Sequence, residues 1–270
     1  MMTKINSTLA KMKLACSIMP LIIFMQLLAQ TQLASAQARF IQPTLEQEPE
    51  NRGAPSDRVG AGSRGNCPAV SKAAVGLVPE MLRKVTQNAG TSTSKFILGL
   101  TEAEYPTFWF YIPYTSKQIS SVKFVLVDEK DTYVTKEPLP ITLSETPGVI
   151  SVPLPKTLKP LERGKYYHWY LLIDCQPQSR SEDIALQGLV KRVAPQPDFT
   201  NRLKTATPSQ QVVLYSQQGY WQDAITILGE LRRKNPQDAA LANDWKELLN
   251  SVQLGDVAAE PISPCCTVEK

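Results

Sequence analysis

The sequence predicts a mainly β protein with added helices. We expect an antiparallel immunoglobulin-like β-sandwich over residues 67–193, followed by a short three-helix segment over residues 201–254. Apolar segments with period two recur in the first region, turn signals separate them, and no long helical period is interleaved. The period becomes helical after a Pro-rich linker at 194–200, and a polar tail expected to be disordered fills 255–270.

Five segments of the first region have the composition and turn boundaries of strands. These segments are Thr107–Tyr114, Ser121–Val127, Val149–Leu154, the stretch from Gly164 to Cys175, and Ala185–Val193.

The stretch GKYYHWYLLIDC, residues 164–175, divides into two faces by its period of two. Tyr167, Trp169, Leu171, Ile173 and Cys175 form a face suited to a core between two sheets. Tyr166, His168, Tyr170, Leu172 and Asp174 form a mixed face that we expect to be half exposed. The strand is therefore predicted to be part of a packed sheet.

The residues that lead into this strand are similar to the tyrosine corner of immunoglobulin-like sandwiches. Leu161-Glu162-Arg163-Gly164 precedes the strand, with Arg163 where proline is usual. In such corners a tyrosine hydroxyl bonds back to upstream backbone, and Tyr167 has the required spacing.

The helical region has clear start and stop signals. Thr207 can cap a helix that has Pro208 in its first position and Gln210 reaching back, and Gly219 ends it. A second helix begins near Trp221 and stops at Asn235-Pro236. A third begins near Asp238, with Leu241, Trp245, Leu248, Leu249 and Val252 inward.

Residues 214–236 resemble one tetratricopeptide repeat. Gly219, Trp221, Ala224 and Pro236 stand at its glycine, aromatic, small and proline positions. One repeat cannot build a solenoid, which needs about three. We therefore expect a short helical unit that packs on the sandwich or recruits a partner.

The N-terminal 36 residues have the pattern of a secretory signal. Three lysines precede the apolar run Leu14–Leu28, and Ala34-Ser35-Ala36 supplies small residues for cleavage before Gln37. The run of 15 residues is shorter than the roughly 18–20 needed for a membrane anchor. Lipidation at Cys16 is disfavoured because the apolar segment follows that cysteine. A secreted or periplasmic location is predicted.

Residues 37–66 have the composition of a flexible leader, rich in Gln, Glu, Pro, Gly and Arg. Gly60–Gly65 fits G-x-G-x-x-G, but neither flank has the strand and helix of a dinucleotide site. No cofactor or metal is expected.

Charge gives no reason to expect nucleic acid or lipid as a partner. Removal of residues 1–36 leaves 26 basic and 25 acidic side chains, so the formal charge falls from +4 to +1. Such a chain has no global attraction to polyanions. Stable membrane insertion after cleavage is not expected either.

Four cysteines remain after cleavage, and four thiols allow three pairings. Cys265 and Cys266 are adjacent, a strained geometry for a bridge. Cys67 and Cys175 flank apolar segments, and we predict a disulfide between them; two buried, reduced thiols are the alternative.

Several motifs together resemble a secreted cyanobacterial family that is known only as a domain of unknown function. The resemblance covers most of residues 52–254 and implies residence in the envelope or periplasm, without a reaction or ligand. Its motifs are Arg64-Gly65-x-Cys67, Pro106–Tyr114, Gly164–Trp169 ending in Cys175, Arg180-Ser181, Gly188-Leu189-Val190-x-Arg192 and the Trp221–Asn235 helix.

Catalysis is disfavoured, and no catalytic residue is assigned. His168 is the only histidine, and Asp174 lies about 20 Å further along the same extended strand. No G-x-S-x-G elbow nominates a nucleophile, and no carboxylate pair is singled out. An extracytoplasmic hydrolase stays as an alternative.

We expect a non-catalytic binding protein whose partner is an envelope protein or a glycan. If Phe108, Phe110 and Ile112 point inward, an aromatic strip of Trp109, Tyr111 and Tyr114 points outward and can stack on a ligand. The alternative is that the helices or another sheet cover this strip. A third hypothesis is a scaffold that recruits a partner through its C-terminal helices. The binding protein and the scaffold differ in which element, sheet or helices, leaves apolar surface exposed.

Overall fold

The computed structural model describes residues 38–45, 58–59, 67–87, 90–144, 146–176, 184–263 and 267–268. The predicted signal peptide, the Gly60–Gly65 motif and the Cys265-Cys266 pair lie outside these residues. One compact unit runs from Gln37 to Lys270.

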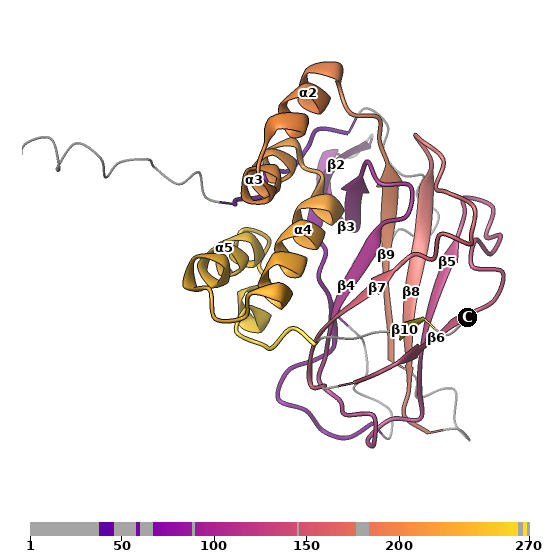
Figure 1. Ribbon diagram of the computed structural model, residues 1–270. Helices are drawn as coiled ribbons and strands as arrows, with labels where there is room; N and C mark the ends of the chain where they lie inside the picture. Colours follow the sequence, from indigo (N-terminus) through magenta and orange to yellow (C-terminus); the bar gives the residue numbers. More distant parts are fainter. Residues whose placement is uncertain are drawn as a thin grey trace, which may run out of the picture. The chain divides into compact units, whose positions relative to one another are not determined.

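Ten strands form two sheets in the described part of the chain (Figure 1). The three-stranded sheet has the order β1-β4-β7, and the seven-stranded sheet has the order β10-β6-β5-β8-β9-β3-β2. The strands are β1 (Val75–Gly76), β2 (Glu80–Gln87), β3 (Gly90–Thr101), β4 (Thr107–Ile112), β5 (Ser121–Val127), β6 (Leu139–Thr142), β7 (Gly148–Pro153), β8 (Tyr166–Asp174), β9 (Ile184–Arg192) and β10 (Thr267–Val268).

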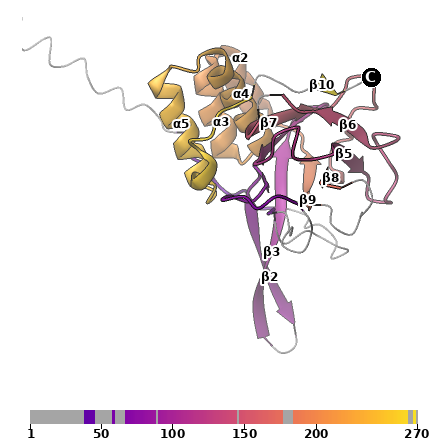
Figure 2. The ribbon, with the colours of Figure 1, turned by 90° about the horizontal axis from the view of Figure 1, so that it is seen from below.

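The seven-stranded sheet is mixed. β3 and β9 pair in parallel, with Leu98 opposite Leu189, while β5, β8 and β9 pair antiparallel. The structure therefore has two sheets as expected, but it departs from the all-antiparallel immunoglobulin-like arrangement. The β2–β3 hairpin, which was not predicted, extends beyond its neighbouring strands (Figure 2).

Strand β4 has two buried faces because layers lie on both sides of it. Phe108 and Phe110 pack against Phe124 and Trp169 of the seven-stranded sheet, with ring centroids 4.7–6.4 Å apart. The intervening Trp109 packs on the helices. The three-stranded sheet is therefore the middle of three layers.

Trp169 on β8 fills the space between the two sheets. A Cβ at Gly188, its partner on β9, would lie 2.2 Å from the Trp169 ring, and a Cβ at Gly76 would lie 2.8 Å from it. Two glycines thus make room for one indole ring, which is a close approach that only glycine permits.

The two faces of β8 agree with the predicted alternation. Its odd-numbered residues from Tyr167 to Ile173 are buried and its even-numbered residues are partly buried. The tyrosine corner is also confirmed, because the backbone N–H of Glu162 donates to Tyr167 Oη at 2.8 Å. This bond fixes the turn that enters the strand.

Four helices follow the sheets, where three were expected. They are α2 (Pro197–Thr205), α3 (Pro208–Gln218), α4 (Trp221–Lys234) and α5 (Ala239–Asn250). The predicted linker 194–200 is wrong in part because α2 starts inside it: Pro197 takes the first helical turn, where proline is tolerated, and Phe199 is buried.

The predicted helix ends are confirmed. Thr207 and Gln210 form a reciprocal capping box on α3, and Gly219 caps its end in the left-handed conformation with φ of 76°. Asp238 caps α5 by accepting from the N–H groups of Ala240 and Leu241.

The predicted tail is ordered where the structure describes it, at 255–263 and 267–268. Ser263 N–H donates to Val149 O at 2.8 Å, and Val149 N–H donates to Pro261 O at 2.7 Å. A 3₁₀ turn at Gly255–Val257 precedes them, and β10 pairs with β6. The free edge of β7 supplies the partners that the polar composition did not reveal.

Described parts of the predicted leader also pack on the fold. Phe40 N–H donates to Ser251 Oγ at 3.1 Å, and Ile41 N–H donates to Ser216 O at 3.0 Å. Arg58 is buried and donates to backbone oxygens of Val78 and Val252. We call residues 38–45 the N-terminal strap.

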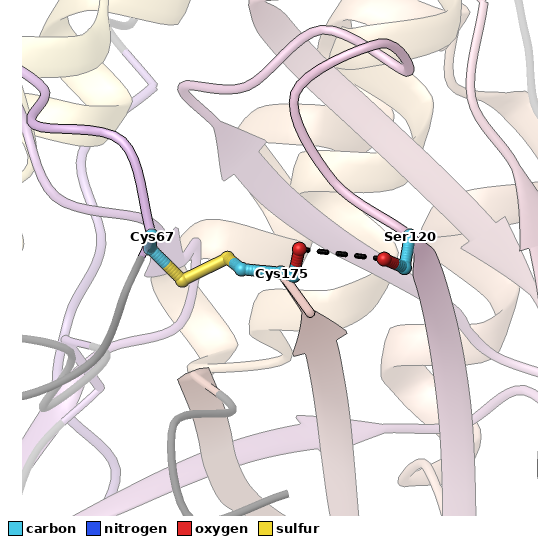
Figure 3. The surroundings of a disulfide bond; sticks show 3 residues. All are labelled: Cys67, Ser120 and Cys175. Carbon is cyan, nitrogen blue, oxygen red and sulfur yellow. Dashed lines mark hydrogen bonds between the residues drawn. A yellow bond between two sulfur atoms is a disulfide. The ribbon is translucent and has the colours of Figure 1, made fainter. Parts of the chain in front are cut away.

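Cys67 and Cys175 form a disulfide, the pair predicted from the sequence (Figure 3). It links the segment before β1 to the end of β8, and Ser120 Oγ donates to Cys175 O at 3.3 Å beside it. The bond closes 108 sequence steps.

Candidate functional site

The predicted aromatic strip is wrong as an exposed surface. Trp109, Tyr111 and Tyr114 are 2%, 5% and 3% exposed. The helices cover Trp109: its Nε1–H donates to Thr226 Oγ1 at 3.1 Å, and its ring lies 5.8 Å from that of Trp245. The alternative that the strip is covered therefore holds, and for Trp109 the cover is the helices.

Another aromatic group lies on the outer face of the seven-stranded sheet, which is the face turned away from the middle layer. Cross-strand partners point to the same face of a sheet. Tyr133 pairs with Val127, Val127 with His168, and His168 with Leu189, so these four side chains form one row. Tyr170 stands in the next row of this face.

We define the outer-face patch as Asp131, Tyr133, His168, Tyr170 and Gln187. Tyr133 is 51% exposed and Asp131 is exposed, whereas the other three are partly buried. Tyr170 and Gln187 are cross-strand partners on β8 and β9. Three separate segments thus contribute to one surface.

A turn after β5 presents the two exposed members. Asp128 Oδ1 accepts from the backbone N–H of Lys130 at 2.8 Å and of Thr132 at 2.9 Å. Asp131 adopts φ of 59°, a left-handed conformation that aspartate tolerates better than most residues. These bonds hold the turn so that Tyr133 returns beside Val127.

His168 and Tyr170 support each other on β8. Their rings stack with centroids 4.2 Å apart, and Tyr170 Oη lies 2.9 Å from His168 Nδ1. Burial lowers the pKa of His168, and this outweighs the opposing effects of Gln187 and Asp131. The imidazole is therefore neutral at pH 7 and acts as a fixed aromatic wall.

The geometry does not bring His168 and Asp174 together. His168 lies opposite Val127, whereas Asp174 lies opposite Ser121 at the other end of the strand pair. Gln187 approaches the imidazole without reaching hydrogen-bond geometry, so His168 Nε2 has no partner among the described residues. Asp174 therefore does not orient the imidazole.

A second polar cluster joins β3 to α4. Asp223 accepts from Thr101 Oγ1 at 3.2 Å and from the backbone N–H of Glu102 at 3.1 Å, and Tyr215 Oη donates to Glu102. Burial raises the pKa of Asp223 to about 7, although the hydrogen bonds that it accepts from Glu102 N–H and Thr101 lower it.

A cavity of about 110 Å³ lies beside Asp223, which suffices for roughly three or four water molecules. The small size of the cavity and the hydrogen bonds across the cluster indicate that these residues hold α4 against β3.

Two further properties concern only the residues that the structure describes. None of their helices is long and apolar enough to cross a bilayer. Among the same residues, no group of three His, Cys, Asp or Glu side chains is arranged to hold a metal ion.

These features define a class of protein: a disulfide-linked, two-sheet β protein with a helical layer and a partly exposed aromatic sheet face. Residues 59–262 match the family described as Domain of Unknown Function (DUF928), and the chain belongs to this family. The match spans sheets and helices together. No curated protein matches the chain.

The two exposed members of the patch, Asp131 and Tyr133, were not predicted as site residues. Tyr133 lies in a polar stretch without strand period, and its place beside Val127 depends on the turn at Asp128. The mixed face of β8 was the one signal that pointed to this side of the sheet.

Proposed function

We propose that this protein is an extracytoplasmic, non-catalytic binding protein that contacts its partner through the outer-face patch. The observation that carries the proposal is the exposed ring of Tyr133 beside the stacked pair His168 and Tyr170. Aromatic rings that stay accessible next to polar groups are typical of recognition surfaces.

The distribution of exposed apolar side chains favours binding at the sheet over recruitment by the helices. Among the described residues, the exposed large hydrophobic side chains all lie outside α2–α5. They are Ile41, Val59, Val70, Leu82 and Tyr133. A partner-recruiting helical face would be expected to leave such side chains accessible.

The helices resembling a tetratricopeptide repeat have a structural role in this proposal. Trp109 of β4 packs on α4 and α5, and a Cβ at Gly219 would lie 2.6 Å from Pro43 of the N-terminal strap. These contacts use the helical surfaces on which a partner would otherwise dock.

An extracytoplasmic location rests on two independent features. The sequence begins with a basic front, an apolar run and a cleavage pattern. The Cys67–Cys175 disulfide requires an oxidising compartment to persist. Recovery of the exported protein with Cys67 and Cys175 protected from thiol alkylation until reductant is added tests this part.

The binding role is tested by sedimentation of the full-length protein with isolated cell envelopes. We expect Tyr133→Ala to lower the bound fraction, because it removes the most exposed ring of the patch. Leu82→Ala is the matched control, since Leu82 is 56% exposed and lies on β2, an edge strand that β3 separates from β9.

Equal binding by Tyr133→Ala and the parent would refute the location of the site. Loss of binding in Leu82→Ala alone would place the contact on the β2–β3 hairpin instead. Hydrolysis of an envelope polymer that His168→Ala abolishes would favour the hydrolase alternative.

A further inference from the structure

We infer that the outer-face patch binds an uncharged saccharide, with a sugar ring on Tyr133 and its hydroxyl groups on Asp131 and Gln187. This inference rests on the proposed binding function and names its ligand class. It follows from the kinds of group that the three segments bring together and from their spacing.

The stacking surface is built before any ligand arrives. Tyr133 is 51% exposed, and its backbone is fixed by the bridge to Val127. His168 and Tyr170 are fixed by their mutual stacking and by the 2.9 Å contact between Nδ1 and Oη. A rigid aromatic surface loses little conformational entropy on binding, which favours a flat apolar ligand face.

The spacing fits an extended ligand. Tyr133 and His168 stand two strands apart in one row, about 10 Å at ordinary strand spacing, with Val127 between them. Val127 is only 6% exposed because neighbouring side chains cover it, so the space between the two rings is filled with protein atoms and offers no open cleft. A saccharide can lie along this closed surface with one apolar ring face on the exposed Tyr133 ring.

The polar atoms around the rings suit hydroxyl groups. The exposed carboxylate of Asp131 accepts hydrogen bonds, and the Gln187 amide both donates and accepts. A sugar hydroxyl also donates and accepts, so it can satisfy both side chains. An apolar peptide side chain would leave them unpaired at a cost.

The charges near the patch disfavour an anionic ligand. Asp131 is the acidic member, and His168 is neutral because burial lowers its pKa. Lys191, the nearest cation on β9 in the adjoining row, lies over the Tyr166 ring at 4.4 Å. Lys130 stands beside Asp131 in the turn, and Lys123 on β5 is exposed on the same face. The charges around the patch are therefore of both signs, and a uronic-acid or sulfated polymer gains little from this face.

The test is a glycan array that carries neutral, uronic-acid and sulfated oligosaccharides, probed with the full-length protein, followed by calorimetric titration of the best neutral oligosaccharide. We expect neutral glycans to bind. Tyr133→Ala should weaken the affinity roughly tenfold through loss of stacking, and Tyr133→Phe should keep most of it. Asp131→Asn, which keeps the turn geometry, should weaken it several-fold.

Leu82→Ala is the control and should bind as the parent does. The inference is overturned if no neutral glycan binds, if anionic glycans bind instead, or if Tyr133→Ala binds as tightly as the parent. Protease treatment of the envelopes distinguishes a wrong ligand class from a wrong binding site. If Tyr133-dependent sedimentation disappears after proteolysis, the patch binds protein, and only the saccharide assignment falls.

Discussion

A methyl group at Gly229 tests whether the helical layer sits on the sandwich as described. A Cβ at this position of α4 would lie 2.3 Å from Cη2 of Trp109, 2.7 Å from Cζ2 and 2.8 Å from Cζ3. Ordinary contacts between carbon atoms begin near 3.5 Å. Either the ring or the helix must therefore move by about 1 Å.

The Trp109 ring has little freedom to move. Its Nε1–H donates to Thr226 Oγ1 at 3.1 Å, the Trp245 ring lies 5.8 Å away, and the Arg233 guanidinium lies over it at 5.2 Å. Overpacking of such a core costs about 1–3 kcal/mol or more, while Gly→Ala in a helix gains about 1 kcal/mol. Because the 2.3 Å contact places the overpacking cost toward the upper part of that range, we expect Gly229→Ala to lower the free energy of unfolding by about 1–2 kcal/mol.

Urea unfolding followed by tryptophan fluorescence and by circular dichroism measures this change, with an unchanged m-value as the sign that the native state stays compact. Trp109→Phe supplies the partner of a double-mutant cycle. In that background the smaller ring should make Gly229→Ala cost clearly less. A Gly229→Ala protein that is as stable as the parent, or more stable, would show that α4 does not press on Trp109.

Three further predictions concern other parts of the fold. Asp223→Asn should remove a pH dependence of stability, because the pKa of this carboxyl is raised to about 7 in the folded protein. As the pH rises from about 4 to about 7, the free energy of unfolding of the parent should fall by about 2–4 kcal/mol relative to the variant. An equal dependence on pH in parent and variant would contradict this. Tyr167→Phe should cost about 1–2 kcal/mol in chemical unfolding because the Glu162 N–H loses its acceptor, and an unchanged midpoint would refute the corner's role. Replacing Cys67 and Cys175 together by serine should lower stability by about 2–5 kcal/mol, measured against the parent with and without reductant; reductant should affect the parent alone.

Features set by neighbouring residues could be predicted from the sequence. The alternation of β8 follows from its period of two, and the capping box of α3 needs only Thr207, Pro208 and Gln210. The tyrosine corner likewise depends on a turn and a strand that are adjacent in the chain. In each case the physical cause lies within about ten residues.

Features set by distant contacts could not be predicted in the same way. Period two gives β4 two faces, but the burial of Trp109 depends on Gly229, which is 120 positions away in the chain. The parallel pairing of β3 with β9 depends on chain topology. Tyr133 became part of a candidate site only through a bridge that its polar surroundings did not signal.

The N-terminal strap imposes an order on the assembly of this molecule. Phe40 and Ile41 are made among the earliest residues, yet their backbone partners, Ser251 and Ser216, are made near the end of synthesis. The Phe40 ring must likewise wait for Trp221, whose ring lies 5.3 Å from it edge-on. The strap therefore completes its contacts only after α5 has been made, and chains that stop before α5 leave Phe40 without the Ser251 contact.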